Sequence, residues 1–247
     1  MIGFVIVSHS EPLAHAAVDL AMQMVHDEAP PVRVASGADG GFGTDAAAIA
    51  DAVDALADSD GVVIITDLGS AVISSELALE LRTSTVPVRI SDGPFVEGIT
   101  AGMVRAATGG SLDDVAHEAA AALAAKRPQG SPASPGAPTS DVLAPDGAST
   151  PDASIDAVLR NPMGLHSRPA SLVVKAAGGF DADVAIADVT TGAGPASAAS
   201  LIGLLTLGVS EGDIVRITAT GAEAAAAVDA IRRLVDDGFG ELAAASA

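Results

Sequence analysis

The chain contains no cysteine, no tryptophan and no tyrosine, and only 2% of its 247 residues are aromatic. Without cysteine it can form no disulfide, no thiolate nucleophile and no cysteine-ligated metal site. Since 49% of the residues are hydrophobic, a core can still be built, mainly from alanine, valine, leucine and isoleucine. The length predicts one or two domains.

Positive charge is also scarce. Twelve lysines and arginines stand against 32 aspartates and glutamates, which gives a formal net charge of −20. Such a chain does not bind nucleic acid or anionic membranes non-specifically, and a partner that is steered to it by charge would present a basic face. No apolar run reaches the ~20 residues of a membrane span, and the short apolar N-terminus has no basic leader. We therefore expect a cytoplasmic protein without a signal peptide.

One long segment is almost free of large apolar residues. Residues 127–153 read RPQGSPASPGAPTSDVLAPDGASTPDA, which is mostly Pro, Ser, Gly and Ala. Burial cannot offset the entropy of ordering such a segment, so it predicts a flexible linker. It separates a domain at 1–126 from a domain at 154–241, and residues 242–247 are expected to be a frayed tail.

The first domain alternates short apolar runs with helical patterns. We predict strands at residues 2–7, 32–35, 61–66 and 86–90, and helices at residues 12–25, 44–57, 71–81, 97–107 and 112–125, with Thr44 as the N-cap of the second helix. Continuous apolar strands between helices predict an α/β domain with a doubly wound, mostly parallel sheet. Ligands on such sheets bind at the carboxyl ends of the strands.

The second domain shows a different order. Strands are predicted at 155–159, 184–187, weakly at 190–197, and at 214–219, with helices at 168–177, 198–207 and 222–235. The order β-α-β-β-α-β-α predicts an α+β open-faced sandwich, in which an antiparallel sheet carries helices on one face.

His9 comes directly after the first predicted strand and before the next helix, with Ser8 and Ser10 on either side. Neutral histidine is a nucleophile, and the free N–H groups at the start of a helix favour an anion. This position suits a phosphoryl-accepting histidine. On position alone, a histidine that merely caps the helix explains the pattern equally well.

Two other loops should reach the same edge of the sheet. The segment GGFGTD brings Gly43 and Thr44, and glycine-rich loops allow backbone amides to approach phosphate. The segment DLGSA follows the third strand, where Asp67 can accept the second ring N–H of His9 and so fix its tautomer, and Ser70 can donate to phosphoryl oxygens. Alone, Asp67 would be read as a helix N-cap. The convergence of three phosphate-friendly loops favours the functional reading.

With these motifs, residues 1–125 resemble the IIA domains of the mannose family of phosphotransferase systems. The matching segments are VIVSHS, GTDA, DLGSA, ELALEL and PFVEG. The forms DLGSA and PFVEG are more similar to the DhaM family, the phosphotransferase subunits of bacterial phosphoenolpyruvate-dependent dihydroxyacetone kinases, than to sugar-specific domains. The resemblance implies a phosphoryl group on Nε2 of His9, assistance from Asp67, and a homodimer formed through this domain.

His166 lies in the segment NPMGLHSRPA, after a predicted strand and a glycine turn. Arg168 supplies a fixed cation that can hold a phosphoryl group, and Pro169 suits the first turn of a helix. The pattern predicts a second phosphohistidine at the N-terminus of a helix. A surface-turn histidine is the alternative.

Residues 154–241 resemble HPr, the histidine phosphocarrier family, through the string Gly-Leu-His-Ser-Arg-Pro-Ala around His166. Many relatives carry a regulatory serine where Ser200 stands. Here Ala199 precedes it and the usual basic residue is missing, so N-capping of a helix is a sufficient role for Ser200. Leu201, Ile202 and Leu204 are similar to the apolar docking patch of that family.

Together the two resemblances imply a phosphate relay. Enzyme I would phosphorylate His166, which would pass the group to His9 of the same or another chain. His9 would phosphorylate ADP on a DhaL-type nucleotide-binding subunit, which acts on dihydroxyacetone held by a DhaK-type subunit. Phosphohistidine is the expected intermediate, with no cofactor or metal bound directly, since Mg²⁺ would belong to the partner's nucleotide. No other histidine has metal-like partners in the sequence.

The source of the phosphoryl group and two alternative functions remain to be stated. Longer relatives carry an enzyme I-like piece after the HPr part, and this chain stops at residue 247, so we expect a separate enzyme I. One alternative function is a IIA–HPr fusion that serves a mannose-type sugar permease. Another is a regulatory binding protein whose phosphorylation state controls a transcription factor.

Overall fold

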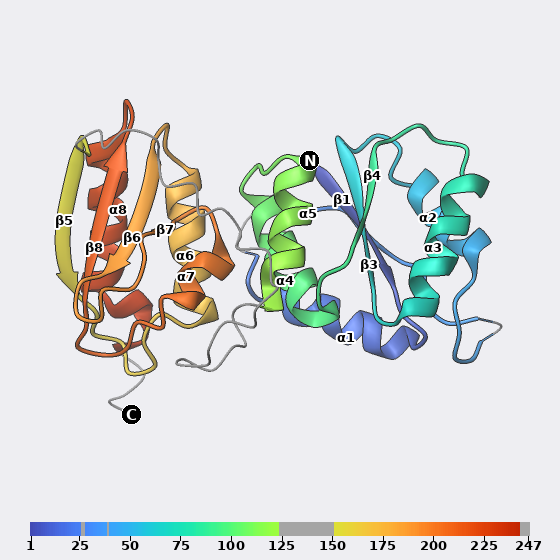
Figure 1. The fold of residues 1–247 in the computed structure, drawn as a ribbon, viewed down its shortest axis with the longest axis horizontal. Coiled ribbons are helices and arrows are strands. Elements are labelled where there is room, and N and C mark those ends of the chain that lie inside the picture. The colour runs from blue at the N-terminus through green and yellow to red at the C-terminus, as the bar shows by residue number, and fades with distance from the viewer. Residues whose placement is uncertain (26–27, 39, 124–150, 243–247) are drawn as a thin grey trace, which may run out of the picture.

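A computed structural model describes residues 1–25, 28–38, 40–123 and 151–242 (Figure 1). The predicted linker, apart from residues 151–153, and the predicted tail, apart from Leu242, lie outside the described residues. In the described ranges, no helix combines the length and the apolar character that crossing a membrane requires.

The first domain is built on a four-stranded parallel sheet. Its strands pair in the order β2-β1-β3-β4. They are β1 (Ile2–Val7), β2 (Val32–Val34), β3 (Gly61–Thr66) and β4 (Val88–Ser91). The helices are α1 (Glu11–Met22), α2 (Ala46–Asp54), α3 (Gly69–Leu81), α4 (Phe95–Ala107) and α5 (Leu112–Ala121).

Helices cover both faces of this sheet (Figure 1). Phe4 and Ile6 of β1 pack in one apolar cluster with α1, α4 and α5, while Val5 and Val7 pack in another with α2 and α3. Because both faces are covered, every residue of β1 and β3 is buried, and the alternation of polar and apolar residues seen in half-exposed strands is absent. The predicted doubly wound α/β sheet is confirmed.

The start of α2 differs from the prediction. Its N-cap is Asp45, whose Oδ1 accepts hydrogen bonds from the backbone N–H groups of Ala47 and Ala48. The side chain of Thr44 instead lies 2.8 Å from the hydroxyl of Ser74 on α3. A carboxylate can accept from two N–H groups at once. Asp45 therefore caps the helix in place of Thr44, and the helix begins one residue later than predicted.

The second domain is a four-stranded antiparallel sheet with the order β5-β8-β6-β7. Its strands are β5 (Ala153–Val158), β6 (Asp183–Asp188), β7 (Ala196–Ser197) and β8 (Ile214–Thr220). Its helices are α6 (Ser167–Gly178), α7 (Leu201–Thr206) and α8 (Ala224–Asp236), followed by a short 3-10 turn at Gly238–Gly240. In β8, buried and more exposed residues alternate, so one face is covered and the other is open. The predicted open-faced sandwich is confirmed.

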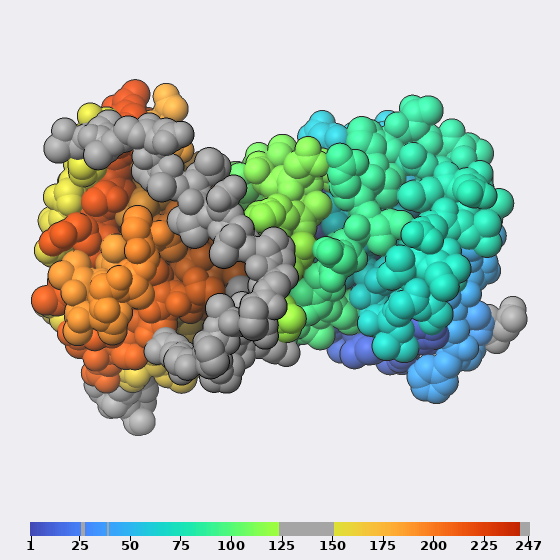
Figure 2. Space-filling model, viewed as in Figure 1, coloured from blue at the N-terminus to red at the C-terminus, as the bar shows by residue number. Residues whose placement is uncertain are grey.

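The two domains form two lobes in the space-filling view (Figure 2). Helices α6 and α7 of the second domain lie toward α4 and α5 of the first (Figure 1). The helix predicted at 198–207 begins only at Leu201, because Ser200 has an extended backbone and caps it through the N–H of Gly203. The weak strand predicted at 190–197 is reduced to Ala196–Ser197.

Candidate active sites

His9 and Asp67 meet because the strands before them are paired. Val7 and Thr66, the last residues of β1 and β3, lie opposite each other in the parallel register. The residues that follow each strand therefore emerge at the same edge of the sheet. The sequence predicted this meeting from the two strand ends.

The ring of His9 is held between a carboxylate and a hydroxyl. Its Nδ1 lies 3.0 Å from Oδ1 of Asp67, and its Nε2 lies 2.9 Å from Oγ of Ser70, in the first turn of α3. Because an ionised carboxylate only accepts hydrogen bonds, Nδ1 carries the hydrogen. In the neutral ring Nε2 then has a free lone pair, which accepts the Ser70 hydroxyl. Nε2 is therefore the ring nitrogen whose lone pair is available.

Asp67 is fixed by several donors. Its Oδ2 accepts from the Ser8 hydroxyl at 2.8 Å and from the backbone N–H of His9 at 2.9 Å, and its Oδ1 also accepts from the N–H of Leu68 at 2.7 Å. Burial alone would raise the pKa of Asp67, but the hydrogen bonds from His9, Ser8 and Leu68 hold that pKa below its ordinary value. The carboxylate therefore stays ionised and continues to accept the hydrogen bond from Nδ1 of His9.

The remaining predicted residues around His9 are placed less directly. Ser10 caps α1 by accepting from the N–H of Leu13, and the N–H of Gly43 donates to the carbonyl of His9 at 3.0 Å. These contacts anchor the loop that carries the histidine. The hydroxyl of Thr44 forms its hydrogen bond with Ser74 on α3.

A second layer of serines supports the loop. The backbone N–H of the fully buried Ser8 donates to the hydroxyl oxygen of Ser36, and the Ser36 hydroxyl donates to the carbonyl of Ile6. Sequence reasoning missed Ser36, which follows the second strand at the same edge of the sheet. Its place after a strand end was the signal that could have identified it.

The loop before His166 depends on Gly164. This residue has a φ of +66°, and a Cβ atom at this position would lie 2.2 Å from the carbonyl oxygen of Val209. The close approach allows the N–H of Leu165 to donate to that same carbonyl at 2.9 Å. Only glycine fits here, and the turn it makes sets His166 at the N-cap of α6.

A carboxylate also holds the ring of His166, on the opposite nitrogen. Nε2 lies 2.9 Å from Oε1 of Glu241, and the second carboxylate oxygen of Glu241 accepts from the side-chain amide of the buried Asn161 at 3.1 Å. By the argument used for His9, Nε2 carries the hydrogen and Nδ1 has the free lone pair. Sequence reasoning missed Glu241, which is 75 residues away along the chain and was assigned only to the end of the domain.

Arg168 lies in the first turn of α6, two residues after His166, and is exposed. Across the ranges that the structure covers, its guanidinium makes no ion pair, so its charge is directed to solvent beside the site. Pro169 is buried in the same turn, as expected for a proline at the start of a helix.

Among the described residues, no group of three or more His, Asp or Glu side chains lies close enough together to hold a metal ion.

Comparison with known proteins identifies both domains. Residues 3–116 match the family EIIA-man, described as the fructose IIA component of the phosphotransferase system, and residues 153–237 match the family PTS-HPr, described as the HPr component phosphorylation site. The HPr protein of Thermoanaerobacter tengcongensis has a solved structure that is 31% identical to this chain, covering 36% of this chain and 97% of its own, with a TM-score of 0.34.

Two curated relatives are similar over almost the whole chain. The phosphoryl donor subunit DhaM of the phosphoenolpyruvate-dependent dihydroxyacetone kinase of Escherichia coli K12 is 37% identical over 98% of the chain. The corresponding subunit of Klebsiella michiganensis is 35% identical over 98% of the chain. The chain covers 51% of the length of each of these relatives.

Proposed function

Because the chain belongs to the DhaM-like proteins, in which a mannose-type EIIA domain is followed by an HPr domain, we propose that it is the phosphoryl donor subunit of a dihydroxyacetone kinase. It relays phosphoryl groups from phosphoenolpyruvate through two histidines. His166 receives the group from enzyme I, and His9 receives it from His166. One observation carries this proposal: at each of the two histidines a carboxylate contacts one ring nitrogen and so fixes the tautomer.

The transfer from His166 to His9 is an exchange of one phosphorus–nitrogen bond for another. The bond from phosphorus to Nδ1 of His166 breaks as the lone pair of His9 Nε2 forms a new bond on the opposite side of the phosphorus. Neither ring has to give up its hydrogen, because Asp67 holds that of His9 and Glu241 that of His166. Each carboxylate also stabilises the positive charge of its ring while that ring is phosphorylated.

The neighbouring groups stabilise the phosphoryl oxygens. Ser70 is released from Nε2 of His9 when the ring is phosphorylated and can then donate its hydroxyl to a phosphoryl oxygen. Arg168 offers a planar cation beside His166. Ser10, Gly43 and Thr44 contribute by fixing the loops around His9.

The phosphoryl group on His9 passes next to ADP, which a DhaL-type nucleotide-binding subunit holds together with Mg²⁺. A DhaK-type subunit binds dihydroxyacetone. We further propose that the protein works in the cytoplasm as a homodimer formed through the first domain. Helix α3 offers exposed apolar side chains for such a contact, which are Ile73, Leu77 and Leu81.

The test of this function follows the phosphoryl group after it has reached the chain. The ³²P-labelled chain is freed of enzyme I and phosphoenolpyruvate and mixed with the DhaL-type and DhaK-type subunits, ADP and dihydroxyacetone. We expect the label to leave the chain and to appear in dihydroxyacetone phosphate. Label that stays on the chain with these subunits, but moves to the IIB component of a mannose-type permease, would assign the chain to sugar transport instead.

A further inference from the structure

Glu118 is a buried carboxylate whose partners lie in the other domain. It belongs to α5 of the first domain, and only 6% of its surface is exposed. Its two oxygens accept from the hydroxyl of Ser200 at 3.0 and 2.9 Å, and one of them accepts from the backbone N–H of Ile202 at 2.8 Å. Burial raises the pKa of Glu118, although the hydrogen bonds from Ile202 and Ser200 act in the opposite direction. A buried carboxylate paired in this way forms a specific contact.

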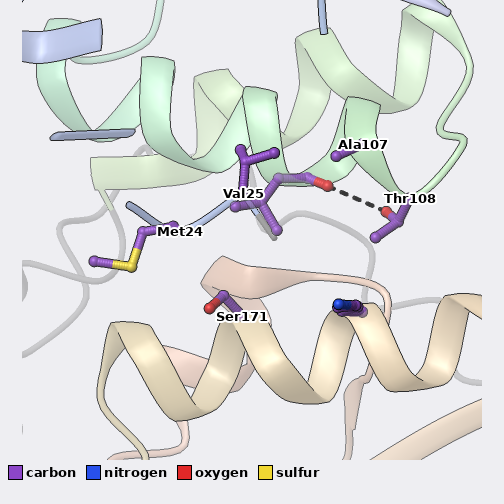
Figure 3. A pocket seen from close by; sticks show the side chains of 7 residues that line it. Met24, Val25, Ala107, Thr108 and Ser171 are labelled. Atoms are coloured by element: carbon purple, nitrogen blue, oxygen red, sulfur yellow. Dashed lines mark hydrogen bonds between the residues drawn. The ribbon is translucent and has the colours of Figure 1, made fainter. Parts of the chain in front are cut away.

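Apolar packing surrounds this contact. Ala101 and Val104 of α4 share one buried cluster with Leu201 and Ile202 of α7. Beside it, Met24, Val25 and Thr108 of the first domain face Ser171 on α6 across a small pocket (Figure 3). The contact is therefore a packed interface with a polar centre.

The two domains approach each other closely at Gly178, where a larger side chain would contact Thr108. A Cβ atom added to Gly178, the last residue of α6, would lie 3.3 Å from Cβ of Thr108, at the end of α4. The end of α6 thus packs against the side chain of Thr108. Leu201 and Ile202 are covered here, so they are not available to any other protein while the domains are in contact.

The interface lies beyond the end of α1 that is far from His9. His9 precedes the N-terminus of α1, whereas Met24 and Val25, just beyond its other end, line the pocket at the interface. A helix of 12 residues is roughly 18 Å long. Transfer of a phosphoryl group requires the reacting atoms to approach to about 3–3.5 Å. In this arrangement His166 makes its ring contact within the second domain and His9 within the first.

We propose that the α4–α5 face of the first domain is a docking site for the second domain of the same chain, centred on Glu118, and that the second domain must leave it before His166 can reach His9 of that chain. The docking site is independent of the proposed function. The second part, on transfer, rests on that function. The docked arrangement is a resting state that covers Leu201 and Ile202.

The absence of cysteine permits a direct test of docking in the full chain. In a Thr108→Cys/Gly178→Cys variant the two Cβ atoms are near the ~3.5–4.5 Å separation of a disulfide. We expect the pair to close within one chain under mild oxidation. A Glu80→Cys/Gly178→Cys control, with the first cysteine on α3 at the opposite face of the sheet, should remain reduced. Equal closure of the two pairs, or closure of neither, contradicts the docking site.

The role of Glu118 is tested in the same cysteine pair. Adding Glu118→Ala should slow closure by about tenfold or more, because the hydrogen bonds from Ser200 and Ile202 to the buried carboxyl group are lost. Adding Glu80→Ala, an exposed glutamate of the first domain, should leave the rate unchanged. If Glu118→Ala closes as fast as the unaltered pair, Glu118 does not centre the site.

The consequence for transfer is measured with the disulfide closed and then reduced. Phosphate on His166 should reach His9 of the same chain at least tenfold more slowly in the closed form, and reduction should restore the rate. Mixed His9→Ala and His166→Ala chains measure transfer between chains separately. Unchanged transfer within the closed chain overturns the second part of the proposal and leaves the docking site standing. Failure of transfer in the wild type overturns the proposed function instead.

Discussion

Oδ1 of Asp67 lies 3.0 Å from Nδ1 of His9, so the carboxylate holds the ring hydrogen and leaves the lone pair of Nε2 available. At the second site Glu241 contacts Nε2 of His166, which leaves Nδ1 free. The two histidines therefore present opposite ring nitrogens. This relationship has consequences that can be measured at each site.

Asp67→Asn should impair His9 more than the small change in shape suggests. Both oxygens of Asp67 accept from two donors each, and an asparagine offers an NH₂ group on one side, so two of those donors lose their acceptor. We expect the transfer of label to His9 to fall by about 10²-fold or more. Asp19→Asn on the exposed surface of α1 is the matched control. Transfer at the wild-type rate in Asp67→Asn would show that the carboxylate does not set the tautomer.

The same residue predicts a pH dependence of stability. The pKa of Asp67 is lowered from its ordinary value of 3.8 in the folded chain. A carboxylate with a lowered folded-state pKa contributes stability that is complete above 3.8 and is lost as the pH falls through the folded-state value. The difference in unfolding free energy between wild type and Asp67→Asn should therefore shrink on acidification. Urea unfolding at several pH values measures it, and a difference that grows below this range contradicts the assignment.

Glu241→Ala should release the ring of His166. Without the acceptor, the hydrogen of the neutral ring is shared between Nε2 and Nδ1, and phosphorylation of His166 should slow by about tenfold. The ring ¹⁵N chemical shifts of His166 report the tautomer without any transfer reaction. Glu211→Ala, at an exposed turn of the same domain, should change neither quantity. Unaltered ¹⁵N shifts in Glu241→Ala would remove Glu241 from the site.

Gly164→Ala separates close approach from backbone strain. Gly164 and Gly212 both have positive φ, +66° and +89°, but only at Gly164 would a Cβ atom overlap the carbonyl of Val209. Gly212→Ala should cost about 1–2 kcal/mol of unfolding free energy from backbone strain alone. Gly164→Ala should cost clearly more and should also slow phosphorylation of His166. Equal costs in urea unfolding of the second domain would show that the overlap is relieved by a shift.

The sequence predicted the parts of the structure that depend on local pattern. The bounds of β1 and β3 were predicted correctly, because each is a short apolar run with a polar residue at its end (Thr66) or directly after it (Ser8). The contact between His9 and Asp67 followed from those strand ends. The predicted N-cap of α2 was wrong by one residue. Thr44 and Asp45 both suit that position, and which of them caps the helix depends on the conformation of the folded loop.

The contacts missed from the sequence are those between distant segments. Glu241 reaches His166 from 75 residues away, after a 3-10 turn in which Phe239 has a φ of +56°. Glu118 reaches Ser200 from 82 residues away and from another domain. Each is a single acidic residue in a chain with many, and no periodicity distinguishes it. Such pairs become visible only when the domains are folded and packed.

The most direct test of the relay follows ³²P from phosphoenolpyruvate, with enzyme I, into wild type, His9→Ala and His166→Ala. The relay predicts label on both histidines of the wild type, on His166 alone in His9→Ala, and on neither histidine in His166→Ala. Label on His9 in the His166→Ala chain would contradict the internal order of transfer and point to an external phosphocarrier. No label on either histidine of the wild type would contradict the relay itself.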